Sequence, residues 1–313
     1  MFDFSLEANF SYLRDNLEGL LDNSPELFAR LFSLGHTIEK IENLDVSELL
    51  RVGLITEDQN HWFCPLFIFE RDRIFLVSEK KGTNPLEVFR PWKEEVDICE
   101  QFFLPPKRMA KVLDLGGGCG TYGIRAASLS KAHVTIADIN PRALQFARFN
   151  ALLNEVDSSV TTVTSSFFDK VTGHFDFIVA GLPYRPSPPN SPSKIYADGG
   201  TDGTHFISKA LAEGSNHLSS GGEMVVCAMV LGDVDKNVLE TRIIASNPNR
   251  EPKIAFEFRQ LQGHQRVFEE WWIDKVGTLS SSERDWMDSL KSKGLTHFHR
   301  VQVKMRKLTG ENA

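Results

Sequence analysis

From Lys111 onward, runs of apolar residues that predict buried strands alternate with amphipathic runs that predict helices. The first strand, in KVLDL, leads into the glycine-rich stretch GGGCG. Because alternating strand and helix units build parallel sheets with helices on both faces, this pattern predicts an α/β fold. Strands are predicted within 111–115, 133–138, 160–166, 175–181, 221–229, 253–262 and 297–308, and helices within 121–130, 140–154 and 203–218.

Two unusual stretches follow predicted strands of this sheet. One is the glycine-rich loop after residues 111–115, and the other is the stiff turn GLPY, which stops the buried run FDFIVA. Parallel α/β sheets bind ligands at the carboxyl ends of their strands, where the strand order reverses. We therefore expect both stretches to serve a binding or catalytic site.

A smaller module precedes the α/β pattern. With 313 residues the chain suits a core domain of about 200 residues and an appendage of about 100. Helices are predicted at SPELFARLFSLG and DVSELLRVGLI, and a strand pair within 61–79, an order that indicates a winged-helix-like module. We expect residues 1–82 to form a recognition or capping domain, 83–108 a linker and lid, and 109–313 the main domain.

Charge is unevenly distributed along the chain. Residues 1–81 contain 15 acidic and 8 basic side chains, a net charge of −7 that equals that of the whole chain. Such a surface repels phosphate backbones, which disfavours nucleic acid as a partner and weakly favours a cationic or neutral substrate. A solvated acidic face without a binding role explains the same charges equally well.

The sequence contains no pattern that predicts a membrane-spanning segment or a metal site. No apolar stretch approaches the ~20 residues that span a bilayer, and the first residues carry acids where a signal peptide carries bases. We expect a cytoplasmic protein without a membrane partner. The cysteines form no C-x-x-C pair, so we predict no metal site and expect reduced, mostly buried thiols at Cys64, Cys99, Cys119 and Cys227.

The stretch LDLGGGCGTYG is compatible with two cofactors. Gly118, Gly120 and Gly123 satisfy the G-x-G-x-x-G pattern of dinucleotide sites, whereas Gly116, Gly118 and Gly120 follow Asp114 near the strand end. A carboxylate beside the loop disfavours a pyrophosphate and suits a cationic ligand, so Asp114 favours S-adenosylmethionine over NAD.

Asp138 ends the second predicted strand. From this position a carboxylate can accept hydrogen bonds from both ribose hydroxyls of either cofactor, although a strand-end Asp is also a common helix cap. The cofactor-binding residues that we predict from the two strand ends are Asp114, Gly116, Gly118, Gly120, Asp138 and Ile139.

Several motifs in order resemble the HemK/PrmC family of class I S-adenosylmethionine-dependent methyltransferases, which methylate the glutamine amide of peptide release factors. They are ADINPRALQFARFNALLN, SSFFDKVTGHFDFIVAGLPY and DGGTDGTHF, and FRPWKEE resembles the family's Arg-Pro lid segment. The resemblance covers about residues 86–230 and implies a Rossmann-like, mostly parallel, seven-stranded sheet. The first 80 residues do not resemble the family's usual helical N-terminal domain.

In that family the turn reads Asn-Pro-Pro-Tyr, whereas here it reads Gly181-Leu182-Pro183-Tyr184. The resemblance implies that oxygens of this turn accept the hydrogens of a planar NH2 group and aim its nitrogen at the methyl sulfonium. Gly181 has no acceptor side chain, but its carbonyl and that of Leu182 remain. We expect these four residues to form the catalytic turn; alternatively, Gly181 only permits close approach and Tyr184 packs.

Other site residues are predicted by location. Ser166 stands where the family often has an acid that contacts adenine, and Phe167 would stack beside it. An amine or guanidinium acceptor would need a carboxylate, for which Glu94, Glu95 and Asp198 are candidates. Tryptophans at 271, 272 and 286 fit a core, a site wall or an interface.

Three functions follow from these patterns. The first is N-methylation of an amino-acid-like small molecule, such as an amine or guanidino compound, or of a protein side chain of the glutamine type. The second is methylation of RNA or DNA bases, which the lack of a basic stripe disfavours. The third is a catalytically inactive binding protein, which the intact glycine loop and Asp138 disfavour. We expect the first, with S-adenosylmethionine as cofactor.

Overall fold

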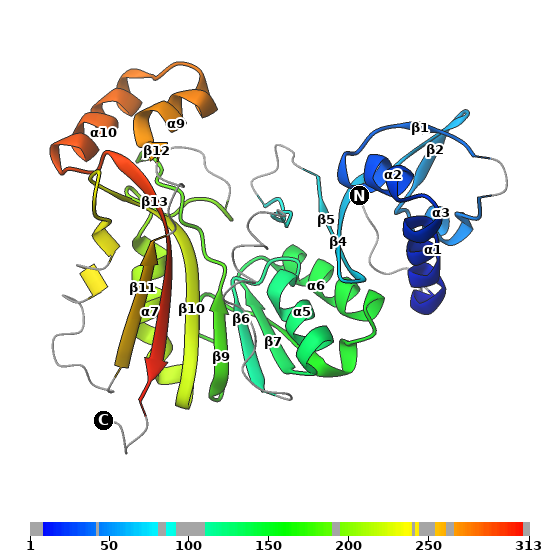
Figure 1. Ribbon diagram of the computed structural model, residues 1–313, viewed down its shortest axis with the longest axis horizontal. Helices are drawn as coiled ribbons and strands as arrows, with labels where there is room; N and C mark the ends of the chain where they lie inside the picture. The colour runs from blue at the N-terminus through cyan, green and yellow to red at the C-terminus, as the bar shows by residue number, and fades with distance from the viewer. Residues whose placement is uncertain are drawn as a thin grey trace. The chain divides into compact units, whose positions relative to one another are not determined.

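The computed structural model describes residues 9–41, 44–80, 86–91, 110–189, 195–239, 242–243, 254–260 and 266–308 (Figure 1). The chain divides into two compact units, Met1–Ser165 and Ser166–Ala313.

Three strands of the first unit lie parallel, in the order β6, β7, β8. They are β6 (Lys111–Leu115), β7 (His133–Asp138) and β8 (Val160–Thr164). The apolar side chains of β6 and β7 are buried, as their continuous apolar sequences predict. Helix α5 (Thr121–Ser130) follows β6, α6 (Pro141–Leu153) follows β7, and both pack against these strands (Figure 1).

Residues 9–80 form a smaller group of elements in the same unit. They comprise α1 (Phe10–Asn23), α2 (Pro25–Phe28), a helical turn (Ala29–Ser33), β1 (Ile38–Glu39), α3 (Ser47–Arg51), β2 (Thr56–Asp58), β3 (His61–Phe63), β4 (Leu66–Arg71) and β5 (Ile74–Glu79). The predicted strand pair is confirmed: β4 and β5 form an antiparallel hairpin, and both residues of its turn, Asp72 and Arg73, have positive φ angles. Helix α1, the longest helix among these elements, is not among the helices that the sequence predicts.

One apolar core joins these N-terminal elements to helix α6. Phe146 and Phe149 of α6 belong to the same buried cluster as Leu17 of α1 and Phe75 of β5. The first compact unit therefore extends well past residue 82. The functional boundaries that we expect at 82 and 108 stay predictions.

Two asparagines, Asn150 in α6 and Asn154 at its C-terminal cap, bind the free edge of the β4–β5 hairpin. Asn154 accepts the Phe75 N–H at 2.9 Å and donates to the Phe75 carbonyl at 2.7 Å. Asn150 does the same with Val77, at 2.8 and 3.0 Å. Four residues of a helix rise about 6 Å and two residues of a strand about 6.6 Å, so the two spacings match. Backbone groups that an edge strand leaves unpaired are thereby satisfied inside the core.

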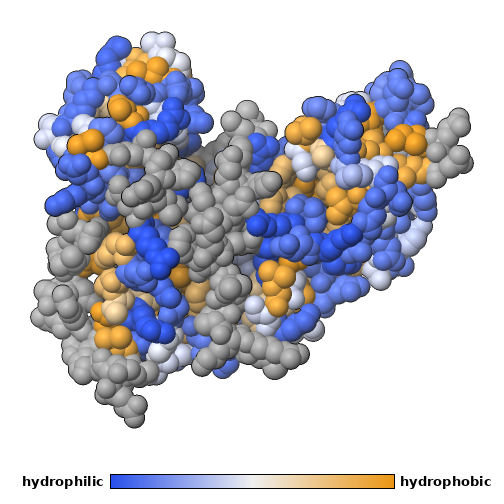
Figure 2. Space-filling view, viewed as in Figure 1, coloured by the Kyte–Doolittle hydropathy of each residue, from blue (hydrophilic) through white to orange (hydrophobic). Residues whose placement is uncertain are grey.

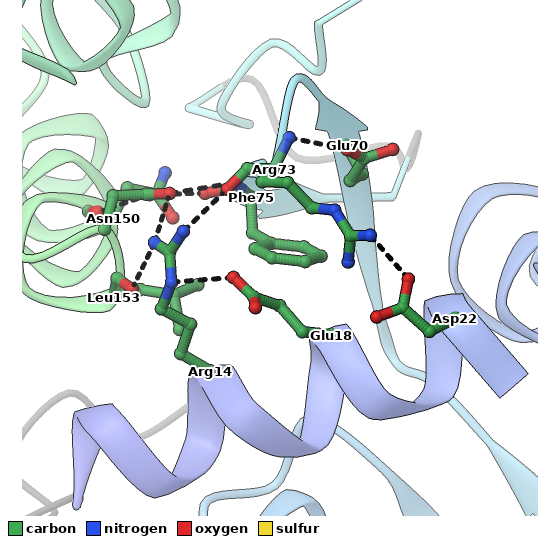
Figure 3. Close-up of polar contacts among 9 residues, drawn as sticks. Arg14, Glu18, Asp22, Glu70, Arg73, Phe75, Asn150 and Leu153 are labelled. Carbon is green, nitrogen blue, oxygen red and sulfur yellow. Dashed lines mark hydrogen bonds and ion pairs between the residues drawn. The ribbon is translucent and has the colours of Figure 1, made fainter. Parts of the chain in front are cut away.

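Arginines on α1 and in the hairpin turn add polar contacts at the border of this core (Figure 3). Arg14 donates to the carbonyl of Arg73 at 2.9 Å, to that of Leu153 at 3.4 Å, and pairs with Glu18 at 2.9 Å. The Leu153 carbonyl lies at the C-terminal end of α6, where the helix dipole favours a cation. Arg73 pairs with Asp22 at 2.5 Å.

The second unit contains β9 (Phe175–Ala180), β10 (Leu218–Gly232), β11 (Ile254–Gln260), β12 (Arg266–Val267) and β13 (His297–Lys307), with helices α7 (His205–Gly214), α9 (Phe268–Val276) and α10 (Ser281–Ser292). β9 and β10 are parallel, whereas β13 pairs antiparallel with β10 and β11. Helix α7 packs on β10.

The helix pair α9–α10 is an insert between β12 and β13 and carries the tryptophans at 271, 272 and 286. Its aromatic rings form a cluster with strand residues, in which Phe268 lies 4.8 Å from Phe298 and Trp272 lies 4.9 Å from Trp286, centroid to centroid. The outer face of this region is mostly hydrophilic, with scattered apolar side chains (Figure 2). Trp272 and Trp286 therefore belong to a core, one of the three roles that we considered.

The α/β class and the mostly parallel arrangement that the sequence predicts are confirmed. The described residues contain seven main strands, three in the first unit (β6, β7 and β8) and four in the second (β9, β10, β11 and β13), of which only β13 runs antiparallel to its neighbours β10 and β11. The short β12 also pairs with β13. Among the same residues, none of the helices has the length and apolar character needed to cross a bilayer.

Cys64 and Cys119 are buried free thiols, and burial raises the pKa of Cys64 to about 11. Cys99 lies outside the described residues.

The shared core predicts a large stability loss when Phe146 is truncated. Phe146→Ala should lower the free energy of unfolding by about 3–5 kcal/mol, because Phe146 is fully buried. Urea denaturation followed by circular dichroism measures the loss. The control is Leu152→Ala on the same helix, where the side chain is 38% exposed and the loss should stay below about 1 kcal/mol. Equal losses in the two variants would contradict the shared core.

Candidate functional site

The glycine-rich loop starts at the end of β6 and is held by the end of β7. The N–H groups of Gly116 and Gly117 donate to the Ala137 carbonyl at 2.8 and 3.2 Å. Gly116, Gly118 and Gly120 have φ angles of +69°, +57° and +90°, a conformation that favours glycine. The backbone itself therefore requires glycine at the three loop positions that we assigned to the cofactor.

The glycines of this loop differ in what surrounds them. A Cβ at Gly117 would lie 2.6 Å from Ile136, and one at Gly120 would lie 2.9 Å from Ile124, so these glycines allow close packing. A Cβ at Gly118 would meet no atom within 4 Å. Among the described residues, Gly118 is thus a position where bare backbone has no close neighbour, as close approach of a ligand requires.

Asp114 lies beneath the loop and is completely buried. Its Oδ2 accepts the Gly123 N–H in the first turn of α5 at 2.7 Å, and no described residue bonds its Oδ1. Burial raises the pKa of Asp114 to about 7, against the lowering effect of the Gly123 bond, and the charge of Asp138 adds to the rise. The structure therefore places Asp114 as a buried support of the loop and not at its surface.

Asp138, at the end of β7, binds both the loop and the start of α6. Its Oδ2 accepts the Gly118 N–H and its Oδ1 the Asn140 N–H, each at 2.8 Å. Burial raises the pKa of this carboxyl, and the two backbone bonds oppose the rise. Each oxygen retains acceptor capacity for a hydroxyl group. Ile139 beside it is 54% exposed, which leaves an apolar surface for an aromatic ring. These residues fit the adenosine part of a cofactor.

Residues 86–91 also contact this part of the first unit, which we did not predict. Asn140 accepts the Arg142 N–H at 3.0 Å as the cap of α6, and its amide donates to the Leu86 carbonyl at 2.9 Å. The Cys119 thiol in the loop lies 4.0 Å from the Phe89 carbonyl. An Asn before a Pro signals a helix cap in the sequence, but nothing in the sequence pairs Asn140 with Leu86.

In the second unit, the predicted catalytic turn follows β9 directly. β9 is buried through Ala180, after which Gly181 is exposed and Leu182 is buried. Pro183 and Tyr184 are half-buried. Leu182 thus anchors the turn by burial, while the glycine before it leaves the backbone accessible.

The loop DGGTDGTHF packs against the residues that follow this turn. Arg185 donates its N–H to the Ala197 carbonyl at 3.0 Å and accepts the Gly199 N–H at 2.8 Å. A Cβ at Gly199 would lie 2.6 Å from the Tyr184 carbonyl carbon, and one at Gly203 would overlap the Tyr184 carbonyl oxygen. Only glycine allows this approach, so the fold joins two motifs that are separate in the sequence.

Further contacts, which the sequence does not indicate, hold the same loop. The Trp286 indole N–H donates to the Thr201 carbonyl at 3.1 Å. Asp202 pairs with Arg242 at 2.7 Å, and its Oδ1 accepts the Thr204 hydroxyl at 2.8 Å. Trp286 comes from the α9–α10 insert, so this insert supports the loop that packs on the turn after β9.

The remaining predicted residues have varied surroundings. Asp198 uses Oδ1 to accept the Gly200 N–H at 3.0 Å, which closes the loop locally. Phe167 lies 5.6 Å from Phe206, centroid to centroid, and Ser166 is exposed. Glu94 and Glu95 lie outside the described residues. The site roles that we assigned to all of these residues stay predictions.

The buried carboxyl beneath the loop predicts a pH dependence of stability. The unfolded Asp114 ionises near its ordinary pKa of 3.8, whereas the folded one keeps its proton up to about pH 7. Below the lower value both states are protonated, so Asp114 has no effect there. As the pH rises toward 7, ionisation favours the unfolded state, by a total of the order of 4 kcal/mol.

Asp114→Asn should remove this contribution. The difference in free energy of unfolding, variant minus wild type, should therefore increase from pH 4 to pH 7. Urea denaturation at several pH values measures this difference. Stability curves of the two proteins that run parallel over this range would show that Asp114 ionises normally.

Comparison with known proteins identifies the family. The family model of the methyltransferase small domain matches residues 88–241. A relative from Methanocaldococcus jannaschii, provisionally named a protein N5-glutamine methyltransferase, is 31% identical over 140 residues, which cover 44% of this chain and 69% of that protein. The ribosomal protein uL3 glutamine methyltransferase of Francisella tularensis is 26% identical, over 71% of this chain and 75% of that protein.

The match to the release factor glutamine methyltransferase of Agrobacterium fabrum has 32% identity and covers 38% of this chain, but only 45% of that protein. The range that the family model matches includes the glycine-rich loop and the turn after β9. The chain therefore belongs to the HemK/PrmC family of class I S-adenosylmethionine-dependent methyltransferases.

Proposed function

We propose that this protein transfers a methyl group from S-adenosylmethionine to the side-chain amide nitrogen of a glutamine in a protein. When bound, S-adenosylmethionine supplies a methyl group already activated by its positive sulfur. The chain's own residues then have two tasks, which are to hold this donor and to orient the acceptor nitrogen.

The first unit would hold the donor. In this proposal Asp138 accepts hydrogen bonds from the ribose hydroxyls, Ile139 lies against the adenine, and the Gly118 backbone adjoins the amino-acid part. Asp114 acts indirectly, because its bond to Gly123 fixes the start of α5 and thus the end of the loop. Ser166 and Phe167, for which the resemblance implies adenine contacts, belong to the second unit, and their role stays a prediction.

The turn of the second unit would orient the acceptor, and the observation that carries this proposal is the close packing of Gly199 and Gly203 on the backbone of Tyr184. This packing fixes the peptide groups of a turn whose first residue is exposed. An amide NH2 has a delocalised lone pair, so its hydrogens need acceptors that aim the nitrogen. With Gly181 in place of Asn, the carbonyls of Gly181 and Leu182 must supply them.

A second candidate acceptor is the amine or guanidinium of an amino-acid-like small molecule. The missing acceptor side chain at position 181 favours it, because a cationic nitrogen would use a carboxylate such as that of Asp198 instead. Glutamine remains the first candidate, because three relatives that match this chain are named as glutamine methyltransferases.

A methyl-transfer screen tests the proposal. Purified protein and S-adenosylmethionine with a radiolabelled methyl group are incubated with a peptide release factor, ribosomal protein uL3, free amino acids including arginine, and total RNA. We expect label in a protein, located on a glutamine by mass spectrometry of peptides. Label in a free amino acid would replace glutamine by the second candidate, and label only in RNA would refute both.

Asp138→Ala tests the donor site. We expect the affinity for S-adenosylhomocysteine to fall at least about 100-fold in isothermal titration calorimetry, because two charge-assisted hydrogen bonds to the ribose are lost. Asp157→Ala is the control, since Asp157 is exposed in the same unit. Unchanged affinity in the Asp138 variant would remove this residue from the site.

Tyr184→Ala tests the catalytic turn. It should leave donor affinity within about twofold of the wild type and reduce kcat about 10- to 100-fold, because the acceptor loses its positioning surface. Gly199→Ala should act in the same direction through the Tyr184 backbone. Gly19→Ala is the matched control, since a Cβ there would meet no atom within 4 Å. Normal turnover in the Tyr184 and Gly199 variants would refute the assigned role of the turn.

A further inference from the structure

We infer that Asn150 is a positioning residue that couples the N-terminal elements of the chain to the cofactor loop. Through this side chain, the packing of β5 on α6 and the binding of the donor should reinforce one another. The inference rests on the proposed function in one respect, namely that the glycine-rich loop binds S-adenosylmethionine.

The side chain of Asn150 is fully buried and all of its hydrogen-bonding atoms are engaged. Its Oδ1 accepts the Val77 N–H at 2.8 Å, and its Nδ2 donates to the Val77 carbonyl at 3.0 Å. The same Nδ2 donates to the Cys119 carbonyl at 2.8 Å. One amide group thus joins an edge strand of the N-terminal elements to the loop.

The hydrogen bond from Asn150 to the Cys119 carbonyl is made in the middle of the glycine-rich loop. Cys119 lies between Gly118, whose N–H binds Asp138, and Gly120, which begins helix α5 in a left-handed conformation. The Cys119 side chain is buried, with 1% exposed. Without the Asn150 donor, the Cys119 peptide would lose a buried partner, and the loop could rotate away from the conformation that presents Gly118.

Asn154 is a natural control for this role. One helical turn further along α6, it makes the same pair of bonds to Phe75 that Asn150 makes to Val77. Its Nδ2 donates its other hydrogen to the carbonyl of Asn150 in the helix, at 2.8 Å, and not to the loop. Both asparagines anchor β5, but only Asn150 also binds the loop in the described structure.

Linkage makes the expected coupling reciprocal. If β5, Asn150 and the loop are aligned together, a ligand that stabilises the loop must also stabilise the bonds to Val77. A partner that binds the N-terminal elements and tightens β5 on α6 would in turn strengthen donor binding. The acidic module would then influence the site without touching the donor.

Two alanine variants test the inference in the full chain, with S-adenosylhomocysteine as the probe. Asn150→Ala and Asn154→Ala should lower thermal stability to a similar extent, because each removes two bonds to β5. Only Asn150→Ala should also weaken S-adenosylhomocysteine binding, by about tenfold, while Asn154→Ala stays within about twofold of the wild type. Equal affinities of both variants and the wild type would overturn the inference.

A second measurement needs no variant and covers the case in which Asn150→Ala fails to fold. Hydrogen exchange of the wild type, with and without S-adenosylhomocysteine, should show slower exchange of the Val77 amide when the ligand is bound. The β2–β3 hairpin of the same module is the internal control and should change less. No protection at Val77 in the presence of bound ligand would overturn the inference.

These outcomes separate the inference from the proposed function. If wild-type protein does not bind S-adenosylhomocysteine at saturating concentration, the proposed function fails. If the wild type binds but neither the Asn150 variant nor Val77 exchange responds as expected, the coupling alone fails and the assignment of the donor site stands.

Discussion

The binding of an edge strand by two asparagine side chains is the interaction on which the first unit depends. Asn150 and Asn154 stand one helical turn apart on α6 and meet alternate residues of β5, because the two spacings agree. Apolar packing alone would hold the hairpin without fixing its register. The amide bonds add direction, so the N-terminal elements and helix α6 share one core and one alignment.

Two carboxyl groups near the glycine loop have different tasks because their surroundings differ. Asp114 is sealed beneath the loop, where desolvation raises its pKa and its bond to Gly123 supports α5. Asp138 binds Gly118 and Asn140 through backbone N–H groups and keeps acceptor capacity on both oxygens. This difference supports the proposal that Asp138 contacts the donor and that Asp114 supports the loop from below.

The turn Gly181–Tyr184, which we propose to be catalytic, is held in place by residues other than those that would contact the acceptor. Its stiffness arises partly from Pro183, and partly from the loop that packs on Tyr184 through Gly199 and Gly203. Trp286 extends this support to the α9–α10 insert. Substitution of the family asparagine by Gly181 removes one acceptor and leaves the supporting loop in place. In the proposed function, such a change affects which acceptor nitrogen the turn can orient.

The sequence by itself determined the alternation of strands and helices from β6 to α7, the glycine positions and the identity of the turn, since periodicity and backbone conformation are local demands. Only the tertiary structure decided that Asp114 is buried, that Asn150 reaches Cys119 and that Gly199 lies against Tyr184. The partners in the last two contacts are distant in the chain. Which distant groups meet depends on how whole elements pack, and no local pattern of residues encodes that packing.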